Sequence, residues 1–308
     1  MSRSIKLLLL LLILQAGLAV WVNLPGDDTG AFEADKPLLT VDVESADAVT
    51  IEQQDKPALR IDRKDGGWVL AEKSNFPVLP GKFEAFADKL LNARRSWPVG
   101  KTLVAARQFK VTPERFERRV RFLRGSEVLG DVFLGSSPAF RKVHARLDGD
   151  ELTYSIDFNA FDAPAEADQW YDTGILKTAV EDIARIDLGA YALKAEGAGF
   201  EVETLREDEQ TDEEGVRKLV RQVTEVGFID VLLDDGKALF DAGKRVVEYT
   251  IEMKEGPSVT HSVVAPDEGG DYILKSSAHP HYFKVVPGPF DEVRDTSRAR
   301  LVKGAGSG

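Results

Sequence analysis

Hydrophobic and polar positions alternate with strand or helix periods through most of the chain, after an opening stretch that is almost wholly apolar. The opening stretch runs from Ile5 to Leu24, which matches the roughly 20 residues that a membrane-spanning helix needs. Arg3 and Lys6 lie at its start, whereas acidic residues follow from Asp27 onward. The positive-inside rule therefore predicts a cytoplasmic N-terminus, with the rest of the chain across the membrane.

A cleaved signal peptide is the alternative for this stretch, because Gly17-Leu18-Ala19 has the small-x-small pattern of a cleavage site. The apolar run continues to Val22, which favours a retained anchor. Small residues in its second half would let a partner helix approach closely, and an interfacial tryptophan would fix its depth. The residues expected in the anchor and in helix packing are Leu7, Leu11, Leu14, Ala16, Gly17, Ala19 and Trp21.

Two later segments, roughly 130 residues apart, share one order of patterns, which indicates an internal duplication. Each begins with an alternating strand, at 46–52 and at 180–187, and continues into a hairpin. The hairpin turns are glycine-rich, and an aromatic residue follows each of them, Trp68 in the first segment and Phe200 in the second.

An amphipathic helix follows each hairpin, predicted over 80–95 in the first segment and after residue 211 in the second. In the second segment, Thr211-Asp212-Glu213-Glu214 predicts a capping box at the start of the helix. Four more strands close each segment. They are expected at 119–123, 128–135, 142–147 and 152–156, and again at 246–253, 258–265, 272–275 and 281–285.

These patterns predict an α+β fold, with one N-terminal transmembrane helix and two tandem, mainly antiparallel α+β repeat units. The expected organisation is a transmembrane anchor at 1–24, a linker at 25–39, a first unit at 40–172, a second unit at 173–302 and a flexible tail at 303–308. Aromatic side chains near the join of the units are expected to pack between them. These side chains are Phe158, Phe161, Trp170 and Tyr171.

Composition narrows the possible functions. The 308 residues include no cysteine, which excludes thiol catalysis, disulfides and cysteine-based zinc sites. The formal net charge of -12 argues against binding to a nucleic-acid backbone, which requires a basic surface. The same charge argues against a polybasic face lying on anionic lipid.

Catalytic motifs do not emerge from the sequence. It contains no Gly-x-Ser-x-Gly, P-loop or dinucleotide-binding pattern. His279-Pro280-His281 suggests a pair of metal ligands, but a surface turn accounts for it better. The acidic runs 207–209 and 212–214 lack the ligand periodicity of a calcium loop. Trp68, Trp97 and Trp170 could line a sugar groove, although core packing is favoured. We therefore expect no catalytic residue, metal or cofactor.

A family resemblance rests on an ordered series of short motifs. The series is Asp47-Ala48-Val49-Thr50-Ile51, Gly66-Gly67-Trp68-Val69-Leu70, an amphipathic helix, Phe109-Lys110-Val111-Thr112-Pro113, Val132-Phe133-Leu134-Gly135-Ser136 and Gln169-Trp170-Tyr171-Asp172. It resembles the bacterial DUF4340 family, although Lys110 replaces a usual glycine and Phe200 stands where the second unit would carry a tryptophan. The resemblance implies a membrane segment and tandem units. It also implies a place beside ABC-transporter components like those of gliding motility, and it carries over no catalytic residue.

The expected function is therefore a non-enzymatic, membrane-anchored periplasmic accessory subunit of an ABC-transporter-like complex. The protein would lie in the bacterial inner membrane as a single-pass protein, with the transporter's membrane subunits as its partners and no nucleic acid. One alternative is an anchored periplasmic module that binds a glycan or a lipid. Another is a hydrolase whose residues follow no known motif. Whether a small molecule binds is left open.

Overall fold

The computed structural model describes residues 15, 36–233, 235–267 and 269–304. The expected anchor, apart from residue 15, and the first part of the linker lie outside the described residues. Within the described ranges, no helix is both long enough and apolar enough to cross a membrane. The described chain is a mixed α/β structure with mainly antiparallel sheets and few helices, which is the coarse fold class that the patterns predict.

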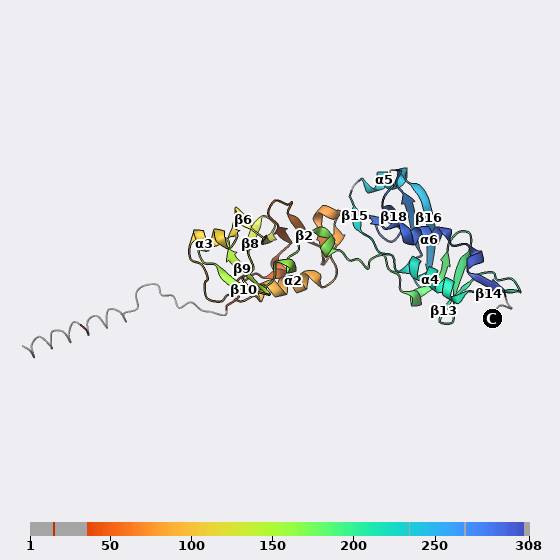
Figure 1. Cartoon of the computed structure of the whole chain (residues 1–308), viewed down its shortest axis with the longest axis horizontal. Helices are drawn as coiled ribbons and strands as arrows, with labels where there is room; N and C mark the ends of the chain where they lie inside the picture. The colour runs from red at the N-terminus through yellow and green to blue at the C-terminus, as the bar shows by residue number, and fades with distance from the viewer. Residues whose placement is uncertain (1–14, 16–35, 234, 268, 305–308) are drawn as a thin grey trace, which may run out of the picture.

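The first of the two large sheets is formed by the N-terminal half of the described chain (Figure 1). Its neighbouring strands follow the order β10-β9-β8-β7-β1-β2-β3-β4, and each pair is antiparallel. The strands are β1 (Ala48–Glu52), β2 (Leu59–Lys64), β3 (Gly67–Leu70), β4 (Phe76–Pro77), β7 (Arg118–Arg124), β8 (Glu127–Leu134), β9 (Lys142–Leu147) and β10 (Tyr154–Asp157).

The second large sheet is formed by the C-terminal half and follows the order β13-β12-β11-β16-β17-β18-β19-β15. Its strands are β11 (Ile183–Asp187), β12 (Ala192–Glu196), β13 (Gly199–Val202), β15 (Asp230–Leu232), β16 (Lys244–Met253), β17 (Val259–Ala265), β18 (Tyr272–Ser276) and β19 (Tyr282–Val285). Two small sheets pair β5 (Val111–Thr112) with β6 (Arg115–Phe116), and β14 (Glu209–Thr211) with β20 (Val302–Gly304).

The two large sheets have the same strand order when their elements are matched along the chain. Strands β1, β2 and β3 correspond to β11, β12 and β13, and strands β7 to β10 correspond to β16 to β19. In each sheet the first strand pairs with the next strand and also with a strand that comes much later. We call the part built on the first sheet unit one and the part built on the second sheet unit two. The edge strands β4 and β15 are additions at opposite ends of this shared order.

Helices cover the apolar faces of the sheets. The described α-helices are α2 (Lys82–Leu91), α3 (Leu103–Gln108), α4 (Glu213–Thr224), α5 (Gly236–Ala242) and α6 (Pro287–Asp295). Short 3-10 turns span Val43–Ser45, Ala71–Lys73, Ala160–Asp162, Ala167–Trp170, Val180–Asp182 and Arg298–Arg300. Phe83, Phe86 and Leu90 of α2 share a buried core with Val49 and Ile51 of β1. Burying a side chain of this size contributes about 1.5–3 kcal/mol.

Helix α2 is shorter than its pattern predicts, for identifiable reasons. It starts at Lys82 because Gly81 has a φ of 77°, a left-handed conformation that glycine adopts without strain. It ends at Leu91, because the residues beyond it pair with the chain that enters the unit. Leu38 N–H donates to the carbonyl of Ala93 (2.9 Å), and Arg95 N–H donates to that of Lys36 (3.0 Å).

Both ends of the described chain differ from the sequence prediction. Leu38 and Leu39, assigned to the linker at 25–39, are buried in the core of unit one. Lys303 and Gly304, assigned to a flexible tail, belong to β20, where Lys303 forms an ion pair with Asp212 (2.8 Å). Both predictions failed for the same reason. Segments distant in sequence supply hydrogen bonds and apolar contacts to each of these two ends.

Unit two contains elements that the patterns did not predict. The capping box is wrong, because Thr211 lies in β14 and its hydroxyl accepts a hydrogen bond from the N–H of Val202 (3.2 Å). Helix α4 instead begins after Asp212. Helix α5 follows β15, and α6 begins at Pro287, which suits the first helical position.

Candidate functional site

The two units meet through a cluster of aromatic side chains around Phe76 of the edge strand β4. The ring of Phe76 lies 5.2 Å from that of Tyr171, 5.7 Å from that of Phe228 and 6.0 Å from that of Phe283, all edge-on. Phe76 is fully buried, and Tyr171 also contacts Phe228 at 5.7 Å. Because Phe228 and Phe283 belong to unit two, this cluster joins the cores of the two units.

A polar contact lies beside the aromatic cluster and also crosses between the units. Asp230, at the start of β15, accepts hydrogen bonds from the Nζ of Lys73 (2.8 Å) and the hydroxyl of Tyr171 (2.5 Å). Burial favours the neutral acid, but these two donors outweigh it and hold the pKa of Asp230 below its usual range. Burial, with the bond to Asp230, raises the pKa of Tyr171. The contact therefore stabilises a carboxylate and a neutral phenol at neutral pH.

The histidine pair at 279 and 281 completes the contact. The Nε2 of His279 lies 2.9 Å from the carbonyl oxygen of Ile175, and that of His281 lies 3.2 Å from the carbonyl oxygen of Ser74. Since a carbonyl only accepts, each Nε2 carries a proton and is not available to a metal. Among the described residues, no group of three or more His, Cys, Asp or Glu side chains is placed to hold a metal ion.

The structure separates the four aromatic residues that were expected between the units. Tyr171 lies in the contact just described. Trp170 is fully buried within unit one, where its indole N–H donates to the carbonyl of Pro164 (2.9 Å) and its ring meets Phe86. Phe158 is also buried in the core that contains α2. Phe161 does not pack between the units, because it is 82% exposed in a 3-10 turn.

Several residues of the contact were not singled out from the sequence. Lys73 follows the first hairpin in a 3-10 turn, and Phe76 lies in a two-residue strand too short to show a period. Phe228 and Asp230 lie in a short apolar segment around β15, which was the available signal for an extra edge strand. The pairing of this segment with β19 could not be read from local pattern.

A groove follows the exposed side of α4 in unit two. Its largest hollow, of about 780 Å³, lies between α4 and the β13–β14 region, and two others, of about 490 and 420 Å³, open beside it. Arg221 lines all three hollows and Arg217 lines two of them. Apolar side chains complete the walls, with Phe200, Val216 and Val220 in the largest hollow.

The charges in this groove are not paired with one another. Arg217 and Arg221 form no ion pair within the described part of the chain, and neither do Glu201, Glu213 and Glu225. Carboxylates and guanidinium groups therefore face solvent together along α4. Such a surface suits a polar partner better than a purely apolar ligand.

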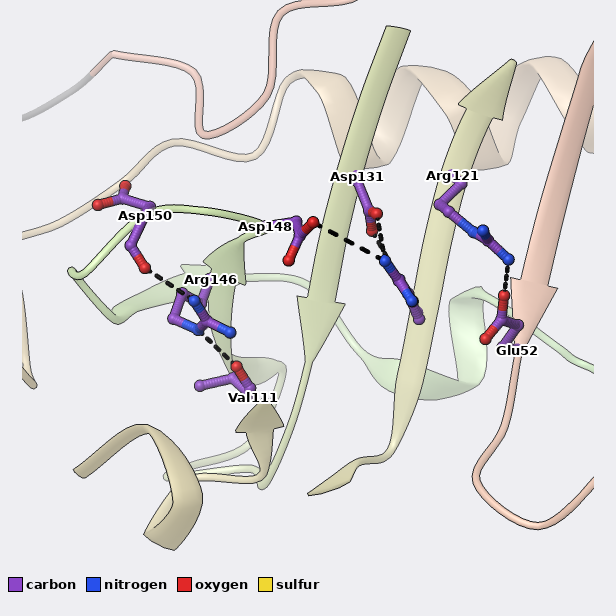
Figure 2. Close-up of polar contacts among 8 residues, drawn as sticks. Glu52, Val111, Arg121, Asp131, Arg146, Asp148 and Asp150 are labelled. Atoms are coloured by element: carbon purple, nitrogen blue, oxygen red, sulfur yellow. Dashed lines mark hydrogen bonds and ion pairs between the residues drawn. The ribbon is translucent and has the colours of Figure 1, made fainter. Parts of the chain in front are cut away.

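The outer face of the first sheet, by contrast, uses its charges internally (Figure 2). Arg121 of β7 pairs with Glu52 of β1, and Arg119 binds both carboxylate oxygens of Asp131 at 3.0 and 2.6 Å. Arg146 is buried and donates to two backbone carbonyls, those of Val111 (2.6 Å) and Asp150 (2.8 Å). The two ion pairs tie neighbouring strands together, and Arg146 holds β5 and the loop at Asp150 against the sheet.

Similar proteins give a family but no activity. A family model described as a domain of unknown function (DUF4340) matches residues 68–243, which is more than half of the chain. The matched range runs from β3 to the residue after α5 and so includes Tyr171, Asp230 and helix α4. No similar curated protein and no similar solved structure was found. The chain therefore belongs to the DUF4340 family.

Proposed function

We propose that this protein is a non-enzymatic accessory subunit, anchored in the bacterial inner membrane, that docks on the membrane subunits of an ABC-transporter-like complex. The observation that carries the proposal is the way in which the two units are joined. Phe76, Tyr171 and Asp230 hold the two units together through both apolar and charged contacts. A body joined in this way can present surfaces from both units to one partner in a fixed arrangement.

The titratable groups support a docking role over catalysis. Burial raises the pKa of Tyr171 between the units and lowers that of His261 inside unit two, so these two shifts arise in packed contacts. The pKa values of active-site groups are expected to be shifted inside a cleft. Arg217, Arg221 and Glu213 along the α4 groove are exposed to solvent, where they can form charge pairs with a partner.

The test is co-purification of the tagged full chain from native membranes in mild detergent. We expect transporter membrane subunits to be recovered with the wild-type chain. The double variant Arg217→Glu, Arg221→Glu should recover less of them, because it reverses the charge of the groove. A matched control, Lys177→Glu with Lys244→Glu, makes the same charge change elsewhere in unit two. Absence of every transporter subunit from the wild-type preparation would overturn the proposal.

The anchor contributes a second, separable contact in this proposal. Gly17 would allow a partner helix to approach closely within the membrane, so Gly17→Leu should weaken co-purification while membrane attachment is retained. Leu11→Ile, a change between bulky residues in the same stretch, is the matched control. Intact assembly in the Gly17→Leu variant would remove the helix contact from the proposal.

The alternative function is an anchored module that binds a glycan or a lipid. The observation that favours it is the hollow of about 780 Å³ beside α4, which falls in the size range of small-ligand sites. Phe200 offers an aromatic face there, and Arg217 offers hydrogen-bond donors. Binding of glycan or lipid fragments to the full chain in detergent, lost on Phe200→Ala, would support this alternative.

A further inference from the structure

An exposed apolar surface lies at the end of unit one that carries α3. Val99, Leu103 and Val104 are 46%, 57% and 74% exposed, and Trp97 is 67% exposed. The basic residue Lys101 lies among them in the sequence, Arg107 follows three residues after Val104, and both are exposed. We call these six residues the end surface. Single exposed apolar residues are ordinary, but four within eight positions concentrate apolar exposure in one short segment, which is typical of an interaction surface.

The surrounding fold holds this surface in a fixed shape. Val99 N–H donates to the carbonyl of Thr153 (2.8 Å), and Thr153 N–H donates to that of Gly100 (2.9 Å), so the segment pairs beside β10. A Cβ at Gly100 would lie 3.0 Å from Ala105 and 3.1 Å from Phe109, so this segment packs closely on α3. The apolar side chains are therefore exposed on a well-packed scaffold.

The local charge is opposite to that of the whole chain. Between Asp88 and Glu114 the sequence has six basic residues and no acidic residue, although the chain carries a net charge of -12. Lys101 and Arg107 form no ion pair within the described residues. The net charge of the whole chain therefore does not describe the charge of this face.

The end surface begins close in sequence to Arg95, which pairs with the point at which the chain enters the described fold of unit one. The described fold starts at Lys36, whose carbonyl accepts a hydrogen bond from Arg95, two residues before Trp97. The apolar stretch ends at Leu24. The residues between them span at most roughly 40 Å when fully extended, at about 3.3–3.6 Å per residue. A bilayer that held this stretch would therefore lie within reach of the end surface.

We propose that the end surface rests on the lipid bilayer and binds anionic headgroups. Trp97, Leu103 and Val104 would enter the interfacial layer, while Lys101 and Arg107 would pair with lipid phosphates. The contact would fix the orientation of both units above the membrane, because the units are joined rigidly through Phe76 and its neighbours. This inference rests on the proposed membrane location but not on docking to a transporter.

The absence of cysteine makes the test direct, because one introduced cysteine can be labelled specifically. The full chain carrying Val104→Cys receives an environment-sensitive fluorophore and is reconstituted in vesicles of phosphatidylethanolamine and phosphatidylglycerol. Leu239→Cys, on an exposed position of α5 in unit two, is the matched control (Figure 1). We expect the label at 104 to shift to the blue and to be quenched by nitroxide lipids, and the label at 239 to do neither.

The charge arm of the experiment tests the headgroup. The variant Lys101→Gln, Arg107→Gln should move the equilibrium between lipid-bound and water-exposed states by about fivefold per charge removed. Lys177→Gln with Lys244→Gln, which removes two charges from unit two, should have no effect. Replacing the anionic lipid with phosphatidylcholine should reproduce the loss seen with the first variant.

The outcomes separate this inference from the proposed function. If the protein floats with the vesicles but the label at 104 remains exposed to water, the lipid contact alone is overturned. A label that is shielded only in the purified complex would assign the surface to a protein partner and also overturn it. A chain that does not float with vesicles would overturn both the inference and the proposed membrane location.

Discussion

Units one and two have one strand order but different polar chemistry on it. We align Ile51 of β1 with Ile186 of β11, because each pairs with a fully buried residue of the later central strand, β7 in unit one and β16 in unit two. The neighbouring position is Thr50 in unit one and Arg185 in unit two. In unit one the guanidinium lies across the pair, on Arg121. Strand order is therefore retained, while the guanidinium group is carried by the first strand in unit two and by its later partner strand in unit one.

The inner faces differ as well. By the same alignment, the paired residues Arg118 and Leu134 of unit one correspond to Tyr249 and His261 of unit two. Arg118 donates to the carbonyl of Ala163, whereas the hydroxyl of Tyr249 lies 2.9 Å from Nδ1 of His261. The spacing of apolar residues therefore determines the strand order, whereas the hydrogen-bond partners of the buried polar groups differ between the two units.

The largest expected effect comes from breaking the contact that makes the two units one body. Phe76→Ala should lower the free energy of unfolding by about 3–5 kcal/mol, because it leaves a cavity among Tyr171, Phe228 and Phe283. We expect the two units then to unfold in separate transitions, measured by calorimetry and by hydrogen exchange.

The matched control is Phe83→Ala, which removes the same side chain from the core of unit one. Phe83 stacks on Trp68 at 3.7 Å between ring centroids and contacts Phe86, both in unit one. Its loss should destabilise that unit by a similar amount without uncoupling unit two. Equal hydrogen exchange in unit two for both variants would show that the aromatic cluster does not couple the units.

The buried histidine of unit two gives the next largest effect. Burial, assisted by repulsion from His279, lowers the pKa of His261 to about 4. In the unfolded chain His261 is protonated below about pH 6.5, whereas in the folded protein it stays neutral down to about pH 4. Its contribution to the free energy of unfolding is therefore fully present above about pH 6.5 and is lost progressively as the pH falls toward 4. The loss is of order 3 kcal/mol for this residue.

His261→Leu should therefore flatten the dependence of the free energy of unfolding on pH between about 6.5 and 4. Urea titrations at a series of pH values measure this slope. His144→Leu provides the comparison in unit one, where burial also lowers the histidine pKa but a hydrogen bond with Ser136 opposes the shift. Its slope should change less. A larger change at 144 than at 261 would contradict the assignment.

How far the sequence predicts this structure follows from which interactions are local. Every main strand of both large sheets, apart from the short edge strands β4 and β15, was expected within a few residues, because alternation and glycine-rich turns are local signals. Helix α3 was missed, because six residues carry too little period, and the register of β14 with β20 depends on partners almost a hundred residues apart. Family membership was predicted from motif order and is confirmed.

The candidate sites show the limit more sharply. Tyr171 was singled out because aromatic residues gather near the join, but its partner Asp230 was not, since one aspartate among many carries no local signal. The end surface was hidden by a different effect. Net charge averages over the chain, and only the structure shows that Lys101 and Arg107 are exposed in the same short segment as several exposed apolar residues.

A smaller effect is expected from the polar part of the contact between the units. Tyr171→Phe removes one donor to the Asp230 carboxylate and should cost about 1.5–3 kcal/mol at pH 7, the usual range for bonds to charged groups. The pKa of Asp230 should rise, so the stability that remains is lost at a higher pH on acidification. Tyr191→Phe, whose hydroxyl donates to the neutral carbonyl of Thr296 within unit two, should cost only about 1 kcal/mol. Similar costs for both variants in urea titrations would show that the charged contact contributes nothing special.

The smallest effect should come from the exchanged charges on the outer faces. Arg185 contacts three carboxylates, those of Asp187, Glu203 and Glu252, whereas Arg121 pairs only with Glu52 among the described residues. Exposed ion pairs contribute roughly 0.2–1 kcal/mol each and weaken as salt rises. Arg185→Gln should therefore destabilise more than Arg121→Gln in low salt, and the difference should vanish near 1 M salt, in melting experiments at matched pH. A difference that persists in high salt would mean that packing of the arginine stem, and not its charge, distinguishes the two sheets.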